Sequence, residues 1–460
     1  MQNDKIVVGL DIGTTKICAL VGRKNEFGKL EILGMGKAVS EGVVRGIVSN
    51  IDKTVDAIKR AIRQAEEQSG INIGVVNVGI AGQHIKSLQH NGSITRASTD
   101  SEITVEDVTR LTNDMYRLVT PPGSEIIHVM PQDYKVDYEE GIMDPVGMSG
   151  VRLEGNFHII TAQSTAINNI NKCVTKAGLE IDNLILEPLS SSMSVLSDEE
   201  KEAGVALIDI GGGTTDLAIF KDGIIRHAAV LPFGGNILTS DIKQGCAVMQ
   251  NQAEQLKVKF GKAIAEEASE YEIVSIPGLR DRAPKEISLK NLAYIIEARM
   301  EEIVELVYAE IQRTGYADKL AAGIVLTGGG SQLQNLVQLT EYVTGMDTRI
   351  GYPNEHLGKS KIEAVKSPMY ATTVGLVLAG YRPLDERINQ SVYEEEQPQV
   401  YYQPQAPEPR YTPPVPAAPQ PAPAPEPEKP KKPSGASKFF QDIISRTKGL
   451  LIDDFDDKQY

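Results

Sequence analysis

The sequence predicts an α/β fold built from two related halves that face one another across a cleft. Residues 209–216 read Asp-Ile-Gly-Gly-Gly-Thr-Thr-Asp, and residues 11–16 read Asp-Ile-Gly-Thr-Thr-Lys. Each motif lies between two short apolar runs with the composition of strands. Each glycine turn therefore leads from one strand into another, which predicts a β-hairpin and excludes both a P-loop and a dinucleotide fingerprint. Two copies of one hairpin indicate two related halves.

Both hairpins carry residue types that bind phosphate. Glycines let backbone N–H groups approach an anion closely, and hydroxyls add further donors. Asp11 and Asp209 end their strands, where each could hold Mg²⁺ through water. The alternative for either copy alone is an ordinary tight hairpin. The candidate nucleotide-binding residues of the two hairpins are Gly13, Thr14, Thr15, Lys16, Gly211, Gly212, Gly213, Thr214, Thr215 and Asp216.

A third glycine stretch follows the apolar run 324–326. It consists of Gly328, Gly329, Gly330 and Ser331, and the residues after it, 333–343, have helical spacing. An adenosine could rest on this turn.

The three glycine stretches, in this order, resemble those of the actin, Hsp70 and sugar-kinase superfamily. Within it the chain is most similar to the FtsA family of actin-like bacterial cell-division proteins, from about residue 5 to residue 382. The resemblance implies an actin-like ATPase fold, in which each half holds a mixed β-sheet flanked by helices and a nucleotide cleft lies between the halves. It also implies ATP and Mg²⁺ as ligands.

Composition narrows the classes of protein and compartment. The chain has 460 residues and a formal net charge of −15, which argues against a nucleic-acid-binding body. The first residues are polar and charged, so we expect no signal peptide, and no apolar run has the length of a membrane span. Three widely separated cysteines favour a reducing cytoplasm and small buried thiols over a disulfide framework.

The motif order and the resemblance together predict how the chain is divided. The first half covers 1–83 and 163–198 and is interrupted by an inserted FtsA-type subdomain, 84–162. The second half covers 199–231 and 315–388 and is interrupted by a peripheral subdomain, 232–314. A Pro-rich disordered linker (389–436) and an amphipathic helix (437–453) follow. In the FtsA family the inserted subdomain contacts neighbouring subunits and later division proteins; a passive surface insertion is the alternative.

Periodicity and capping residues predict the main elements. Helices are expected at 52–68, 106–118, 165–176, 238–246, 252–260, 291–314 and 371–381, with Asn50 or Asp52 capping the first and a capping box at Thr104. Further strands are expected at 30–36, 75–80, 124–131, 132–136, 181–186 and 271–276.

The resemblance assigns roles to three charged residues. Glu187 begins a helix after the strand 181–186, at the position where superfamily members orient the attacking water; a carboxylate that interacts with the helix dipole is the alternative. Glu254 and Lys257 lie three residues apart on one helix face and would contact the ribose; the alternative is an exposed ion pair. By resemblance, the peripheral subdomain receives the C-terminal tail of FtsZ.

The last residues predict a tethered membrane anchor. Most of the 25 prolines lie in the linker, a composition that cannot bury a core; a Pro-rich ligand is the alternative. On a helical wheel from Ser437 the large apolar side chains cover one stripe, with two cations at its edges, as in helices that lie in a membrane interface. Docking on the body or on a partner is the alternative. The candidate membrane residues are Phe439, Phe440, Ile443, Ile444, Arg446, Lys448, Leu450 and Leu451.

Together with these observations, the resemblance implies an ATP-binding, actin-like cell-division protein on the cytoplasmic face of the membrane. By the same resemblance it would polymerise there, anchor FtsZ filaments and help to recruit later division proteins, and its acidic composition predicts no nucleic-acid partner. The four aspartates after residue 452 weaken each anchor, and polymerisation would compensate through avidity. The alternatives are a superfamily sugar kinase or phosphatase, an Hsp70-like chaperone and a pilus-assembly actin homologue. Whether ATP is hydrolysed, slowly or not at all, stays open.

Overall fold

The computed structural model of the protein describes residues 5–96, 102–278, 283–358 and 362–381. The linker predicted at 389–436, the helix predicted at 437–453 and its eight candidate membrane residues lie outside the described residues.

The first half is organised around a five-stranded mixed sheet. Its order is β11-β6-β1-β2-β3, with β1, β2 and β3 antiparallel and β1, β6 and β11 parallel. The predicted N-terminal hairpin is the pair β1–β2, in register from Ile6 opposite Arg23 to Ile12 opposite Ile17. The strands are β1 (Ile6–Ile12), β2 (Lys16–Lys24), β3 (Leu30–Val39), β6 (Val75–Ile80) and β11 (Glu180–Leu186).

The second half repeats this sheet. Its order is β14-β13-β12-β17-β18, with β12, β13 and β14 antiparallel and β12, β17 and β18 parallel. The predicted second hairpin is β12–β13. The strands are β12 (Val205–Ile210), β13 (Thr215–Lys221), β14 (Ile224–Leu231), β17 (Ile324–Thr327) and β18 (Thr348–Ile350). The prediction of two related α/β halves is confirmed.

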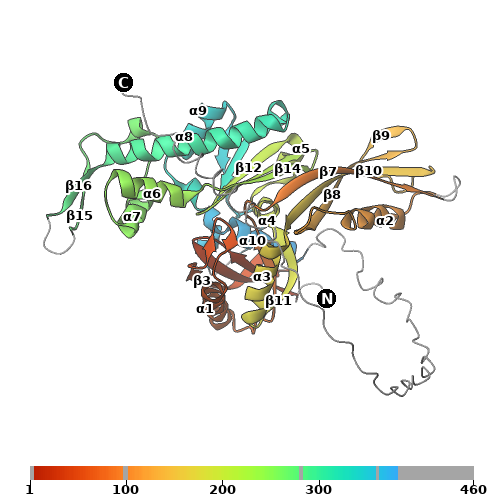
Figure 1. Ribbon diagram of the computed structural model, residues 1–460, viewed down its shortest axis with the longest axis horizontal. Coiled ribbons are helices and arrows are strands. Elements are labelled where there is room, and N and C mark those ends of the chain that lie inside the picture. Colours follow the sequence, from red (N-terminus) through yellow and green to blue (C-terminus); the bar gives the residue numbers. More distant parts are fainter. Residues whose placement is uncertain (1–4, 97–101, 279–282, 359–361, 382–460) are drawn as a thin grey trace, which may run out of the picture. The chain divides into compact units, whose positions relative to one another are not determined.

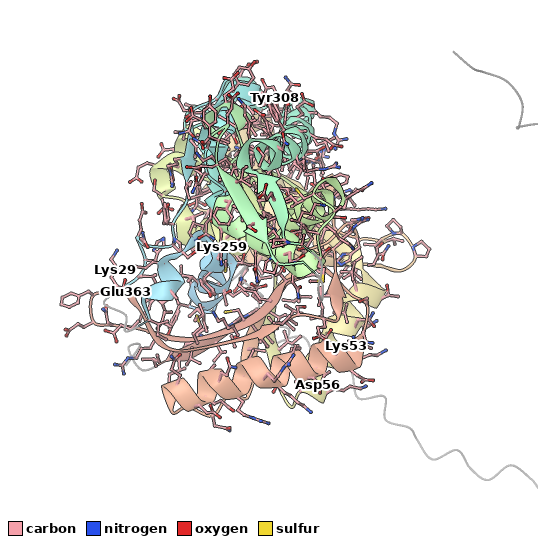
Figure 2. All side chains as sticks on the ribbon, turned by 90° about the vertical axis from the view of Figure 1, so that its left-hand side faces the viewer. Lys29, Lys53, Asp56, Lys259, Tyr308 and Glu363 are labelled. Carbon is pink, nitrogen blue, oxygen red and sulfur yellow. The ribbon has the colours of Figure 1, made fainter. Side chains whose placement is uncertain are left out.

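Helices α1 (Ile51–Ser69) and α3 (Ser164–Lys176) cover one face of the first sheet (Figure 1). Asn50 caps α1 by accepting a hydrogen bond from Lys53 N, and Gly70 ends it in the left-handed region. The helix lies so close to β3 that a Cβ on Gly36 would stand 1.8 Å from Ala61 O. Its opposite face is charged, and Figure 2 shows Lys53 and Asp56 on that outer side.

The segment predicted as an insert forms a four-stranded sheet of its own, ordered β7-β10-β8-β9. Helix α2 (Val105–Tyr116) packs on it and begins with the expected capping box between Thr104 and Asp107. The short hairpin β4 (Val43–Val44) and β5 (Ile47–Val48) belongs to the first half. The insert strands are β7 (Lys86–Thr95), β8 (Ser124–Val136), β9 (Glu139–Ile142) and β10 (Arg152–Gln163).

Both segments predicted as strands, 124–131 and 132–136, are extended, but the break expected between them is absent because they form one continuous strand, β8. Its pairing with β10 passes from Pro131 opposite Phe157 to Asp133 opposite Asn156, so Gln132 is the extra residue of a bulge. A proline is tolerated at a bulge because its missing N–H is not needed there.

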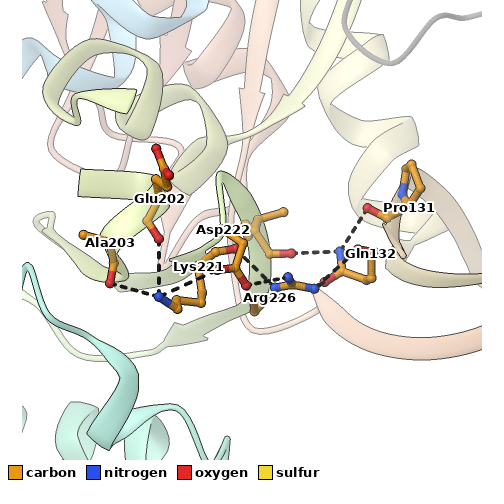
Figure 3. A network of polar contacts seen from close by, with 8 residues as sticks. Pro131, Gln132, Glu202, Ala203, Lys221, Asp222 and Arg226 are labelled. Carbon is orange, nitrogen blue, oxygen red and sulfur yellow. Dashed lines mark hydrogen bonds and ion pairs between the residues drawn. The ribbon is translucent and has the colours of Figure 1, made fainter. Parts of the chain in front are cut away.

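The bulge connects the insert to the second half (Figure 3). The Gln132 Nε2 atom donates to Ile225 O at 2.9 Å, and the Arg226 guanidinium donates to Gln132 Oε1 at 3.4 Å. Arg226 also pairs with Asp222 at 3.1 Å. Lys221 donates to the carbonyls of Glu202 and Ala203, at the end of α5 (Asp198–Ala203). This polar network fixes β8 against β14.

Four helices of the second half follow its first three strands. A two-stranded sheet, β15 (Ile273–Ile276) and β16 (Lys285–Ser288), precedes the long α8. The helix predicted to begin at 333 begins at Leu336, because Gly330–Gln332 forms a short 3₁₀ turn first. The helices are α6 (Gly235–Gly245), α7 (Gln250–Phe260), α8 (Leu289–Arg313) and α9 (Leu336–Thr344).

Two helices lie between the sheets and join the halves. They are α4 (Glu187–Val195) and α10 (Ala371–Ala379), and they pack on each other (Figure 1). Their backbones nearly touch, since a Cβ on Gly375 would stand 1.8 Å from Ser190 O.

Cys18, Cys173 and Cys246 are free and buried, as expected. In the part of the chain that the structure describes, no helix combines the length and the apolar character needed to cross a membrane.

Candidate nucleotide-binding cleft

The three glycine stretches converge on one cavity of about 460 Å³. It is lined by the β1–β2 turn, the β12–β13 turn, the loop after β17 and the first residues of α4 and α10. Of the residues singled out from sequence, those that line it are Asp11, Gly13, Thr14, Thr15, Lys16, Glu187, Asp209, Gly211, Gly212, Gly213, Thr214, Asp216, Glu254, Lys257, Gly328, Gly329 and Gly330.

The two hairpin turns face each other across the cavity. A Cβ on Gly213 would lie 2.6 Å from Thr14 Oγ1, and one on Gly212 would lie 1.9 Å from Thr15 Oγ1. Any side chain here would push the turns apart. The glycines therefore permit the close approach that the repeated motif predicted.

The loop after β17 reaches the same point because β17 runs parallel to β12. Gly328 has φ +83°, and a Cβ there would lie 2.2 Å from Asp209 Oδ1. Two predicted binding residues do not line the cavity and instead brace its loops. Ser331 Oγ donates to Gly328 O at 2.8 Å, and Thr215 Oγ1 donates to Phe233 O at 2.8 Å.

Four carboxyl groups gather at the bottom of the cleft. Asp209 and Asp216 are direct partners across the β12–β13 ladder, where like charges repel. Asp11 comes from the other half, and Glu187 begins α4. The three aspartates are at most 6% exposed. Lys16 is the nearby cation, with Nζ 3.7 Å from Asp11 Oδ2.

Burial and mutual repulsion shift these groups toward their protonated forms. Burial raises the pKa of Asp11 and of Asp209, although hydroxyl donors oppose the shift. Burial, and next the charge of Asp209, raises the pKa of Asp216 well above its usual range. Burial raises the pKa of Glu187 well above its usual range, and Asp11, Asp216 and Asp209 add to the shift. The cluster would be relieved by a cation.

The residues present fit a hydrated Mg²⁺. Asp216 Oδ1 is buried and has no hydrogen-bond partner among the described residues, so it is free to accept from a metal-bound water. No group of three or more His, Cys, Asp or Glu side chains in the described ranges has the geometry of a metal cage. Mg²⁺ often keeps several waters and takes few direct protein ligands. This cleft suits that mode of binding.

Glu254 and Lys257 pair on α7, with Lys257 Nζ 2.8 Å from Glu254 Oε2. The pair is not merely a solvated one, since both side chains reach Thr239 Oγ1 and line the cavity. Lys257 Nζ also donates to Gly235 O at 2.8 Å. The ribose contact itself stays a prediction.

Several lining residues were not anticipated. One group is apolar and comes from the second half, where it could cover one face of a base: Leu238, Val258, Met300 and Leu333. Two more lie at the start of α10: Met369 comes just before this helix, and Thr372 is its second residue. The sequence signal for these residues is weak, because single apolar or hydroxyl residues inside helical patterns read as ordinary core positions.

Comparisons with known proteins identify the family to which this chain is similar. Residues 206–375 match the family model of the cell division protein FtsA, and residues 82–161 match the model of the SHS2 domain inserted in FtsA. Cell division protein FtsA of Pseudomonas aeruginosa is 42% identical over 392 residues, covering 85% of this chain and 93% of that protein. The Escherichia coli protein of the same name is 37% identical over 402 residues, covering 84% and 95%.

Among solved structures, the PilM–PilN type IV pilus biogenesis complex includes a similar chain. Its TM-score is 0.59 at 16% identity, covering 82% of this chain and 99% of that one. At this identity the likeness concerns the fold alone, which is the actin-like ATPase fold. Both relatives carry the same name and are covered over more than nine tenths of their length, and both family models match. The chain therefore belongs to the FtsA family of cell division proteins.

Proposed function

We propose that the chain is an ATP–Mg²⁺-dependent, polymerising cell-division protein that binds the cytoplasmic face of the membrane and anchors FtsZ filaments there. The observation that carries the nucleotide part is the pair of opposed glycine turns around four crowded carboxyl groups. Turn N–H groups and Lys16 supply positive character toward phosphate oxygens, while Asp11, Asp209 and Asp216 would hold a hydrated Mg²⁺. The apolar end of the cavity suits an adenine.

Hydrolysis of ATP would be slow or absent. Glu187 lies at the first residue of α4 and lines the cavity, where it could orient a water. Burial and the charges of Asp11, Asp216 and Asp209 raise the pKa of Glu187, and a bound Mg²⁺ would lower it again. Phosphate release by the full chain tests this part. Release that falls to background in Glu187→Ala supports a slow ATPase, and no release from the wild type supports a nucleotide that only closes the cleft.

The membrane part rests on the C-terminal sequence pattern. Phe440 and Ile443 fall in the middle of the apolar stripe, whereas Gln441 and Ser445 fall on the opposite, polar side. A helix of this kind lies in the interface with its apolar face buried and its cations near the headgroups. One such helix binds weakly, and a filament that presents many of them gains about 10²–10⁴ in avidity.

Vesicle co-sedimentation of full-length variants tests the anchor. The vesicles contain phosphatidylethanolamine and phosphatidylglycerol, and ATP–Mg²⁺ is present throughout. We expect the double variant Phe440→Glu, Ile443→Glu to stay in the supernatant. The matched control Gln441→Glu, Ser445→Glu adds the same charge to the polar face and should still sediment. Equal sedimentation of the two variants would rule out the apolar stripe as the anchor.

The FtsZ part has a candidate surface in the peripheral subdomain. Both strands of the β15–β16 sheet are edge strands that an extended peptide could join. Tyr271 is 90% exposed just before β15, Ile273 is 57% exposed within it, and Tyr294 is 53% exposed on α8. Exposed aromatic and aliphatic side chains beside a strand edge suit a short peptide that binds by strand addition.

Binding of a synthetic peptide with the FtsZ tail sequence tests this surface. Ile273→Lys should weaken the peptide affinity about tenfold, equivalent to about 1.4 kcal/mol. The control Val119→Lys changes an apolar residue that is fully exposed in the inserted subdomain and should leave the affinity unchanged. Loss of affinity in the control alone would place the tail on the insert instead.

A further inference from the structure

The first turn of α10 lies where the two halves meet. On one side α10 packs on α4, with Gly375 against Ser190. On the other side it packs on β1, where a Cβ on Gly9 would lie 2.9 Å from both Leu376 Cβ and Thr373 O. Because both contacts are made by backbone or Cβ atoms, α10 has little freedom to shift between the halves. Side chains on its first turn are therefore held in fixed places in the cleft.

Thr372 reaches the carboxylate of the second half. Its Oγ1 atom donates to Asp209 Oδ2 at 3.1 Å, and Ser191 Oγ on α4 donates to the same oxygen at 2.6 Å. The two hydroxyls are 3.0 Å apart. One oxygen of Asp209 is thus held by donors from both connecting helices. Its second oxygen faces Gly328.

Thr373, the next residue, reaches the carboxylate of the first half. Its Oγ1 atom donates to Asp11 Oδ2 at 3.3 Å, and the Thr373 side chain is fully buried. Asp11 and Asp209 are each the last residue but one in the first strand of their hairpin. Two consecutive hydroxyls on one helix therefore bind equivalent carboxylates from two different halves.

We infer that Thr372 and Thr373 are positioning residues for the metal that accompanies the nucleotide. They orient Asp11 and Asp209, which approach from opposite sides, so that both carboxylates accept from one hydrated divalent cation. Because both threonines belong to α10, they also connect the cation site to this helix. A change in the spacing of the two halves would therefore move α10 relative to one of the two carboxylates. This inference rests on the proposed binding of ATP–Mg²⁺.

A purely structural role predicts something different. Thr373 is a buried polar residue, and its hydroxyl could serve only to satisfy Asp11 inside the core. Loss of that bond would then lower the stability of the protein and weaken ATP binding equally at all Mg²⁺ concentrations. A positioning role predicts an effect that depends on Mg²⁺.

The test measures the ATP affinity of the full chain as a function of Mg²⁺ concentration, from chelator to millimolar metal. Thr372→Val and Thr373→Val keep the branched shape and remove the hydroxyl. We expect each to raise the Mg²⁺ concentration for half-maximal ATP binding by about tenfold, as for a lost hydrogen bond to a charged group, with unchanged affinity in chelator. Thr372→Ser and Thr373→Ser keep the hydroxyl and should stay within about twofold of wild type.

Ser191→Ala removes the other donor to Asp209 and should raise the Mg²⁺ requirement for ATP binding as the valine variants do. The inference therefore stays testable if a valine variant does not fold. Wild-type Mg²⁺ dependence in all three variants, or a loss that is equal with and without Mg²⁺, would overturn the inference alone. A wild-type chain that binds no ATP at any Mg²⁺ concentration would overturn the proposed nucleotide function together with it.

Discussion

A Cβ atom on Gly213 would lie within 3.0 Å of three atoms of Thr14, namely Oγ1, Cγ2 and Cβ. The two residues belong to the two hairpin turns, and the Thr14 hydroxyl itself accepts from Gly46 N at 3.2 Å. A rotation of Thr14 would not clear the space, because its Cβ is among the atoms met. The halves can approach this closely only because position 213 has no side chain.

Gly213→Ala should hold the two turns apart and weaken ATP binding. Overpacking of this kind costs about 1–3 kcal/mol, which corresponds to an affinity about 5–150 times lower. The double variant Gly213→Ala, Thr14→Ala removes two of the three atoms met and should recover part of the affinity. Calorimetric titration with ATP–Mg²⁺ measures both. An unchanged affinity in the single variant would mean that the turns do not need to meet.

Gly375→Ala should destabilise the protein, although alanine is the better helix former. The added Cβ would stand 1.8 Å from Ser190 O, a backbone atom of α4 that cannot move alone. We expect a loss of about 1–3 kcal/mol in the free energy of unfolding. Gly74→Ala, where a Cβ would meet nothing within 4 Å, is the control and should be near neutral. Equal melting temperatures for the two variants would contradict the close packing of α4 and α10.

Asp216→Asn should stabilise the ligand-free protein at pH 7.5. Burial and the neighbouring Asp209 charge raise the pKa of Asp216 in the folded state, so its ionised form disfavours folding. That cost is absent below the unfolded pKa of about 4 and grows as the pH rises through the folded pKa. The asparagine variant should therefore be more stable by about 1–3 kcal/mol at pH 7.5, with a gain that shrinks as the pH falls. A gain that is independent of pH, or a loss at pH 7.5, would contradict this account.

His158 should make the protein sensitive to acid. It lies on β10, is fully buried against Ser87 and faces His227, which pairs with Glu310 at 2.8 Å. Burial, and next the His227 charge, lowers the pKa of His158 to about 4. Its contribution to stability is present above the unfolded pKa of about 6.5 and is lost as the pH falls toward 4, by up to about 3 kcal/mol.

Melting temperatures of the ligand-free chain between pH 7.5 and 4.5 test the role of His158. His158→Gln can keep a hydrogen bond to Ser87 and should flatten the acid limb of the profile. The control His90→Gln changes an exposed histidine on the neighbouring strand β7 and should keep the wild-type slope. An unaltered slope in His158→Gln would assign the acid sensitivity to other groups.

Much of the cleft could be predicted from sequence because the repeated motif is local and chemically explicit. Strand, glycine turn and strand, written twice, specified the two hairpins and the carboxylates at their ends. The third loop was found for the same reason. Ser331 and Thr215 were predicted to bind the nucleotide, but their hydroxyls donate to backbone carbonyls and do not line the cavity. Glu187 was identified because its place between a strand and a helix matches the position at which superfamily members orient the attacking water.

The rest depends on contacts between distant segments. Thr372 and Thr373 acquire their partners only when α10 packs between the halves, more than 160 residues away in sequence from Asp209 and more than 360 from Asp11. The strands expected at 124–131 and 132–136 form one strand because β10 pairs with both parts, across a bulge at Gln132. The apolar end of the cavity is assembled from single residues of several elements, none of which stands out in its own helix.

Sedimentation of the full-length wild type with vesicles, with and without ATP–Mg²⁺, tests the central claim most directly. The account predicts that ATP–Mg²⁺ greatly increases the protein found on vesicles, with a steep dependence on protein concentration, and that Gly213→Ala loses this increase. Binding to vesicles that is the same with and without ATP–Mg²⁺ would contradict a nucleotide-dependent membrane polymer.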